Sequence, residues 1–122
     1  MAVHNFKKLD VWKKARELVK EIYIMSAKFP SEERFGIVSQ IRRAAVSISL
    51  NISEGSGRGT DKDFSRFLDM SYSSALEVEN LIYLCYDLGF IDIKKQDEML
   101  GKVSEVQKML RGFQSKLDKG NL

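Results

Sequence analysis

Apolar residues recur every three or four positions along most of the chain, and this periodicity constrains the fold more than any other feature of the sequence. Steps of three and four place side chains on one face of an α-helix. With one proline, Pro30, and 8 glycines, the chain also lacks the frequent turn residues that an all-β fold requires. We therefore expect an all-α protein made of long helices.

Four segments carry this pattern, and the breaks between them have the chemistry of helix ends. Asp10 is the expected N-cap of the first helix, and Pro30 follows its end. We expect Gly55 to close the second helix in the left-handed conformation, Thr60 to cap the third and Gly89 to end it. Short links require antiparallel neighbours, as in an up-down-up-down four-helix bundle. The predicted helices cover residues 10–28, 32–54, 61–88 and 93–118.

The 122 residues have the size of one domain, and we assign residues 1–122 to a single bundle. No apolar run approaches the roughly 18 residues that cross a bilayer, and the N-terminus lacks the apolar core of a secretory signal. We therefore expect a cytoplasmic protein. A lone cysteine, Cys85, and a lone histidine, His4, offer no zinc ligand set. The glycine-rich link at residues 55–59 follows a helix and lacks the Gly-Lys-Ser/Thr ending of a nucleotide loop, so we expect neither metal nor cofactor.

The second predicted helix departs from a simple amphipathic pattern. The apolar Val46 and Leu50 lie outside the main apolar face. A polar stripe follows one edge and consists of Gln40, Arg43, Ser47, Asn51 and Glu54. In one interpretation a second subunit covers this helix; in the other, the stripe is solvated and the two apolar residues are exposed. The first interpretation predicts an oligomer interface at Gln40, Arg43, Val46, Ser47, Leu50, Asn51 and Glu54.

Residues 40–55 of this helix, QIRRAAVSISLNISEG, resemble a family signature. The resemblance extends over nearly the whole chain, through Phe6-Lys7-Lys8-Leu9, Val11-Trp12, Phe29-Pro30, Glu33, Ser74 and Glu77. On these residues the chain is similar to the S23-type family of four-helix bundles encoded in intervening sequences of bacterial 23S ribosomal RNA genes. It is more distantly similar to the accessory protein of diversity-generating retroelements.

The resemblance implies a bundle that assembles as a ring, commonly a pentamer, with nucleic-acid binding suspected for many members. The family has no common catalytic residues that could be carried over to this chain. We therefore expect no enzyme activity.

Basic residues gather in two parts of the sequence. The net charge of +3 per chain is modest, but an oligomer repeats each basic group, and attraction to phosphates grows with the number of charges. Arg43 also belongs to the polar stripe, where it suits an intersubunit salt bridge as well as a phosphate. The candidate nucleic-acid-binding residues are Arg42, Arg43, Arg58, Lys62 and Arg66 around the second helix and the glycine link, and Lys13 and Lys14 in the first helix.

These observations lead to one main functional hypothesis and one alternative. The main hypothesis is a homo-oligomeric adaptor, without enzyme activity, that binds structured RNA or DNA through phosphate contacts. The alternative is a protein-interaction scaffold that recruits a partner protein, in which case the basic charge is incidental. An enzyme ranks third.

Overall fold

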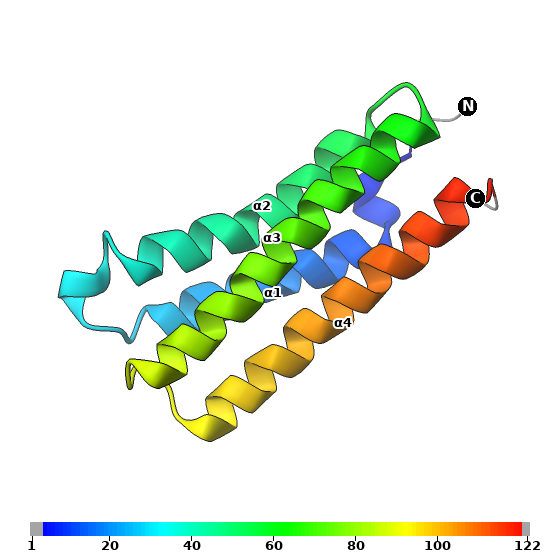
Figure 1. The fold of residues 1–122 in the computed structure, drawn as a ribbon. Coiled ribbons are helices and arrows are strands. Elements are labelled where there is room, and N and C mark those ends of the chain that lie inside the picture. The colour runs from blue at the N-terminus through cyan, green and yellow to red at the C-terminus, as the bar shows by residue number, and fades with distance from the viewer. Residues whose placement is uncertain (1–3, 121–122) are drawn as a thin grey trace.

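Four long helices run antiparallel in chain order in the computed structural model, which describes residues 4–120 (Figure 1). The helices are α1 (Asp10–Ser26), α2 (Ile37–Ser56), α3 (Asp61–Asp87) and α4 (Ile93–Asp118). Two short 3-10 turns, η1 (Phe6–Lys8) and η2 (Ser31–Glu33), precede α1 and α2. The expected all-α four-helix bundle is confirmed.

The apolar face of each helix points into one core. The heptad-like seam of α3 is buried along its whole length and consists of Phe64, Leu68, Ser71, Ala75, Val78, Ile82 and Cys85. Ser71 is the polar member of this seam, and its Oγ donates a hydrogen bond to the Ile48 carbonyl of α2 over 2.7 Å. The buried hydroxyl is therefore satisfied, and α2 and α3 are fixed against each other at this level.

Several helix ends follow the expected chemistry. The Thr60 side chain accepts a hydrogen bond from the Asp63 amide at the start of α3. Gly89 takes a φ of 80°, which ends α3 in the left-handed region that glycine tolerates. The Asp92 side chain then accepts from the Lys95 amide over 2.8 Å and caps α4.

The ends of α1 and the start of α2 differ from the expectation. Leu9, not Asp10, occupies the N-cap of α1 and makes no side-chain cap hydrogen bond, so Asp10 is the first helical residue. α1 ends at Ser26, two residues before the expected position. α2 begins at Ile37 instead of residue 32, because residues 31–33 form a 3-10 turn and Gly36, with φ −104° and ψ −118°, interrupts the helical backbone.

Gly55 has a different role from the one expected. It is a buried residue inside α2, and its φ is not positive. A Cβ at this position would lie 2.7 Å from Phe64 Cδ1 and 2.7 Å from Phe67 Cβ. Gly55 thus permits a close approach of α2 and α3, and the helix continues past it to Ser56.

The bundle has two recognisable halves. The start of α1, the α2–α3 turn and the end of α4 lie at one end, and the other two turns lie at the opposite end (Figure 1). Ser47 and Ser74 meet at mid-length, with their Oγ atoms 2.9 Å apart, and Leu18 and Val106 line one groove between α1 and α4. We call residues 4–17, 48–73 and 107–120 the terminal half, and residues 18–47 and 74–106 the distal half.

Candidate functional site

Charge is distributed unevenly between the two halves. The terminal half contains twelve Lys and Arg residues and seven Asp and Glu residues, a net charge of +5. The distal half contains eight Lys and Arg residues and ten Asp and Glu residues, a net charge of −2. The modest +3 of the whole chain therefore conceals a basic end and a mildly acidic end.

Exposed apolar side chains show the opposite distribution. Within residues 4–120, eleven large hydrophobic residues are exposed, and nine of them belong to the distal half. The two in the terminal half, Leu50 and Met70, lie close to the middle of the bundle. The exposed apolar side chains within residues 4–120 are therefore concentrated in the distal half.

A groove of about 650 Å³ follows the outer side of α2 within this region. It contains three arginines, exposed and half-buried apolar side chains, and no carboxylate. We call it the α2 groove, and its lining consists of Tyr23, Arg34, Phe35, Val38, Ser39, Arg42, Arg43, Val46, Ser47 and Leu50. It brings two of the expected phosphate-binding residues together with several of the expected interface residues.

Arg42 is held in place on one wall of the α2 groove. Its Nε donates to Ser26 Oγ over 2.8 Å, and its guanidinium carbon lies 4.4 Å from the centre of the Tyr23 ring. Ser26 Oγ in turn donates to the Ile22 carbonyl over 2.7 Å. These partners fix the guanidinium without neutralising it, so Arg42 presents a preorganised positive charge.

The rest of the α2 groove is more exposed. Arg43 is exposed and forms no salt bridge within residues 4–120. Leu50 is 52% exposed and Phe35 is 86% exposed, while Val46 is half-buried. Arg34 stacks over the Phe35 ring at 5.1 Å. Arginine and aromatic side chains are the residue types enriched in protein interfaces.

The residues of the predicted polar stripe have two different environments in the structure. Asn51 Nδ2 donates to the Ser47 carbonyl and Oγ over 2.9 and 3.1 Å, and Ser47 Oγ meets Ser74 Oγ of α3. Ser47 and Asn51 therefore make contacts within the subunit, while Gln40 and Glu54 are exposed. Of the expected interface residues, Arg43, Val46, Ser47 and Leu50 line the α2 groove.

The basic residues of the glycine link are partly neutralised. Arg58 Nε donates to Asp63 Oδ2 over 2.7 Å, and Arg66 Nε donates to Asp63 Oδ1 over 3.0 Å. The hydrogen bond from Arg58, followed by that from Arg66, lowers the pKa of the Asp63 carboxyl below its ordinary value. Both guanidinium groups also lie over the Phe67 ring, at 4.9 and 4.8 Å. Lys62 is exposed and shares a shallow depression with acidic neighbours.

The two lysines of α1 have different surroundings. Lys13 is exposed, whereas Lys14 Nζ lies 3.7 Å from Glu17 and 3.5 Å from Glu105 of α4. The candidate phosphate-binding residues therefore do not form one site. Arg42 and Arg43 lie in the α2 groove, and the others lie in the terminal half.

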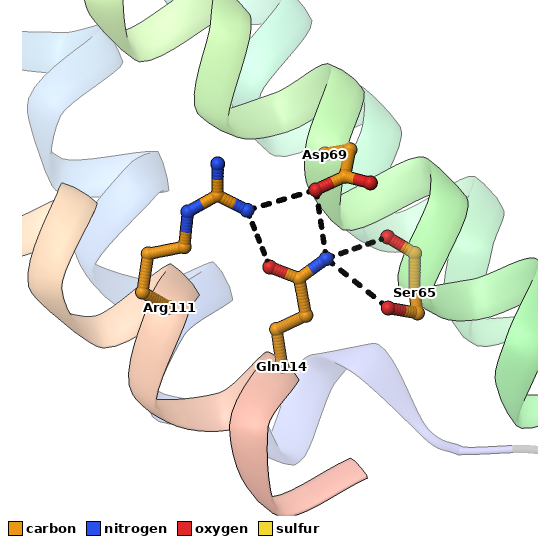
Figure 2. A network of polar contacts seen from close by, with 4 residues as sticks. All are labelled: Ser65, Asp69, Arg111 and Gln114. Carbon is orange, nitrogen blue, oxygen red and sulfur yellow. Dashed lines mark hydrogen bonds and ion pairs between the residues drawn. The ribbon is translucent and has the colours of Figure 1, made fainter. Parts of the chain in front are cut away.

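A polar network between α3 and α4 was not predicted from the sequence (Figure 2). Gln114 Nε2 donates to the Ser65 carbonyl over 3.0 Å and to Asp69 Oδ1 over 2.9 Å, while Arg111 Nη1 donates to Asp69 Oδ1 and to Gln114 Oε1. The hydrogen bond from Gln114, and then that from Arg111, lowers the pKa of Asp69. Arg111 also stacks on Tyr72, 3.7 Å from the ring centre. The network fixes the register of α4 against α3.

The described residues supply little for covalent or metal chemistry. Cys85 is buried, and burial raises the pKa of its thiol to about 11, which keeps it protonated at neutral pH. Residues 4–120 hold no group of three His, Cys, Asp or Glu side chains placed to bind a metal ion. In the same part of the chain, every helix is too short or too polar to cross a membrane.

Comparisons with known proteins agree with this architecture. No curated protein matches the chain. The fold is similar to a crystal structure from Bacteroides thetaiotaomicron VPI-5482, described as a protein with unknown function from the S23 ribosomal protein family. The TM-score is 0.76 at 24% identity, over 84% of this chain and 96% of the other. The family model of the 23S rRNA-intervening sequence protein matches residues 7–112. The chain therefore belongs to the 23S rRNA-intervening sequence protein family.

Proposed function

We propose that this protein is a non-enzymatic adaptor that binds the phosphates of RNA or DNA through its terminal half, which a homo-oligomer presents several times. The observation that carries the proposal is the separation of charge along the bundle, with +5 in the terminal half and −2 in the distal half. Affinity for nucleic acid increases with the number of phosphates that basic groups neutralise. A repeated basic end would therefore bind a polyanion much more tightly than a single subunit.

The surroundings of the candidate residues rank their expected contributions. Lys13 and Lys62 are exposed and form no salt bridge within residues 4–120, so their charges are free to meet phosphates. Arg58 and Arg66 share the single carboxylate of Asp63, which leaves about one net positive charge for the three groups. We therefore expect Lys13 and Lys62 to contribute more to phosphate binding than Arg58 and Arg66 do.

A pair of charge-matched variants tests the proposal. Lys13→Gln with Lys62→Gln removes two exposed charges from the terminal half, and Lys28→Gln with Lys94→Gln removes two from the distal half. Each protein is titrated with a structured RNA and with a duplex DNA at low and at physiological salt. We expect the first pair to weaken binding and flatten its salt dependence, and the second pair to leave both close to the parent values.

Two results would contradict the proposal. Equal losses in the two double variants would show that binding follows net charge and not the terminal half. No binding by the parent protein at low salt would favour the alternative function, a scaffold that recruits a partner protein. The gathering of exposed apolar side chains in the distal half is the observation that favours this alternative.

A further inference from the structure

We infer that the α2 groove of one subunit receives the outer face of α3 from a second copy of this chain, with the two bundles parallel. This inference rests on the homo-oligomer of the proposed function, and it identifies the two surfaces that meet. The argument uses the exposed side chains, the charges and the position along the bundle of each surface.

The outer face of α3 carries an apolar ridge on the side away from the core seam. Leu76, Tyr83 and Leu84 of α3 are 47%, 45% and 40% exposed, and Leu88, at the C-cap of the helix, is 58% exposed. Four exposed large apolar side chains so close together are unusual. Acidic residues accompany them on the same face. We call this surface the α3 ridge, and it consists of Leu76, Glu77, Tyr83, Leu84, Asp87 and Leu88.

The charges of the α3 ridge and the α2 groove are complementary. The groove contains three arginines and no carboxylate. The chain has no Lys or Arg between Arg66 and Lys94, so the ridge contains acidic groups and no basic group. Complementary charge patterns select the correct partner and its orientation at an interface.

Neither surface fits a copy of itself. Two grooves face to face would bring six arginines together without a carboxylate, and two ridges would bring only acidic charges together. Like charges facing each other at an interface are strongly unfavourable. A contact between different surfaces of identical subunits is heterologous, and it builds a ring when its rotation closes.

The two surfaces also occupy the same level of the bundle. The α2 groove extends from Phe35 near the distal end to Leu50 near mid-length, and the α3 ridge extends from Leu88 to Leu76 over the same interval. Two copies that lie parallel and side by side bring the groove and the ridge to the same height. All terminal halves then lie on one side of the assembly, so their basic charges add.

Two point variants test which surfaces meet. Leu50→Glu damages the groove, and Leu84→Lys damages the ridge; both side chains are exposed, so the subunit fold should survive. Circular dichroism confirms the helices of each variant. By light scattering we expect each variant alone to lose the parent oligomer and to approach 14.0 kDa, the mass of one chain.

Mixing the two variants gives the sharper test. The Leu50→Glu protein keeps an intact ridge and the Leu84→Lys protein keeps an intact groove, so one contact remains possible between them. The mixture should regain association and reach at least twice the subunit mass. Ile24→Glu and Ile93→Lys are matched controls at exposed apolar positions outside both surfaces, and they should keep the parent mass.

Three results would overturn the inference. A variant with the parent mass would show that its surface is free in the oligomer and available to a different molecule. A mixture that stays at one subunit mass would show that groove and ridge do not bind each other. A parent protein of 14.0 kDa would remove the oligomer altogether. In contrast, an intact oligomer that fails to bind nucleic acid would contradict only the phosphate-binding proposal.

Discussion

The terminal and distal halves of this bundle share one core but differ in their surfaces. The terminal half has a net charge of +5 and few exposed apolar side chains. The distal half has a net charge of −2 and contains nine of the eleven large apolar residues that are exposed in the described part of the chain. The overall composition of a small helical protein can therefore hide two different surfaces. A net charge of +3 indicates neither the basic end nor the apolar end.

Two pairs of arginines, one in each half, also differ in a way that the composition does not show. Arg58 and Arg66 share Asp63, so their formal charge is partly cancelled where they stand. Arg42 and Arg43 line a groove without any carboxylate, so no acidic group of the groove cancels their charge. Four sets of variants test this contrast between the halves.

The largest effect is expected at Gly55 in the terminal half. In Gly55→Ala, the new Cβ would meet Phe64 and Phe67 at 2.7 Å, so α2 and α3 must move apart. We expect a loss of about 3 kcal/mol in the free energy of unfolding, the upper end for overpacking. Gly101→Ala is the control, because nothing lies within 4 Å of its Cβ, and it should gain about 0.5–1 kcal/mol. Urea unfolding measures both; similar changes in the two variants would show that the helices do not approach closely at Gly55.

Larger side chains in the core of the distal half should also destabilise the protein, but by less than Gly55→Ala does. Ala44 and Ala45 are 3% and 0% exposed, and a leucine at either position should reduce the free energy of unfolding by about 2 kcal/mol. Ala27→Leu, at an exposed position, is the control. The close-packing assignment is wrong if both buried variants melt within a degree of the parent and keep its oligomeric state.

The α3–α4 network predicts a smaller effect that depends on pH. Gln114→Ala should cost about 1 kcal/mol at neutral pH, because it removes hydrogen bonds from a buried amide. The lowered pKa of Asp69 means that its share of the stability is present above the ordinary value of 3.8 and is lost as the pH falls through the lowered pKa. The difference between parent and variant should therefore shrink in acid. Denaturant unfolding at pH 7 and below pH 3.8 measures it, and a constant difference would contradict the role of Asp69.

The smallest effect on stability is expected at Asp63. Its side chain is only half-buried and its two ion pairs lie at the surface, so Asp63→Asn should hardly change the free energy of unfolding while it frees Arg58 and Arg66. We expect tighter nucleic-acid binding with a steeper salt dependence. Asp97→Asn changes the net charge equally in the distal half and is the control. If both variants bind alike, the terminal half has no special role in phosphate binding.

The sequence alone predicted the parts of the fold that depend on neighbouring residues. The predicted fourth helix, residues 93–118, matches α4. Thr60 and Gly89 act at the helix ends as their local chemistry indicates. Periodicity and capping are local properties, and for that reason they can be read from one sequence.

Features that depend on distant residues were missed. The start of α2 was placed too early because Glu32, Glu33 and Arg34 are good helix formers, whereas the structure forms a 3-10 turn at residues 31–33 and leaves Phe35 exposed. The α2 groove combines residues from α1, the first link and α2. Ser65 and Gln114 are 49 positions apart. The role of Gly55 depends on two phenylalanines of the next helix, which no local pattern reveals.

The separation of charge along the bundle also has a kinetic consequence. A rod with a positive and a negative end is an electric dipole, and the field of an anionic polymer exerts a torque on it. A subunit or a parallel assembly that approaches RNA or DNA would turn its terminal half forward before any contact forms. A larger fraction of encounters would then have the productive orientation. The association rate would be high at low ionic strength and would fall steeply with added salt, because salt shortens the range of the field.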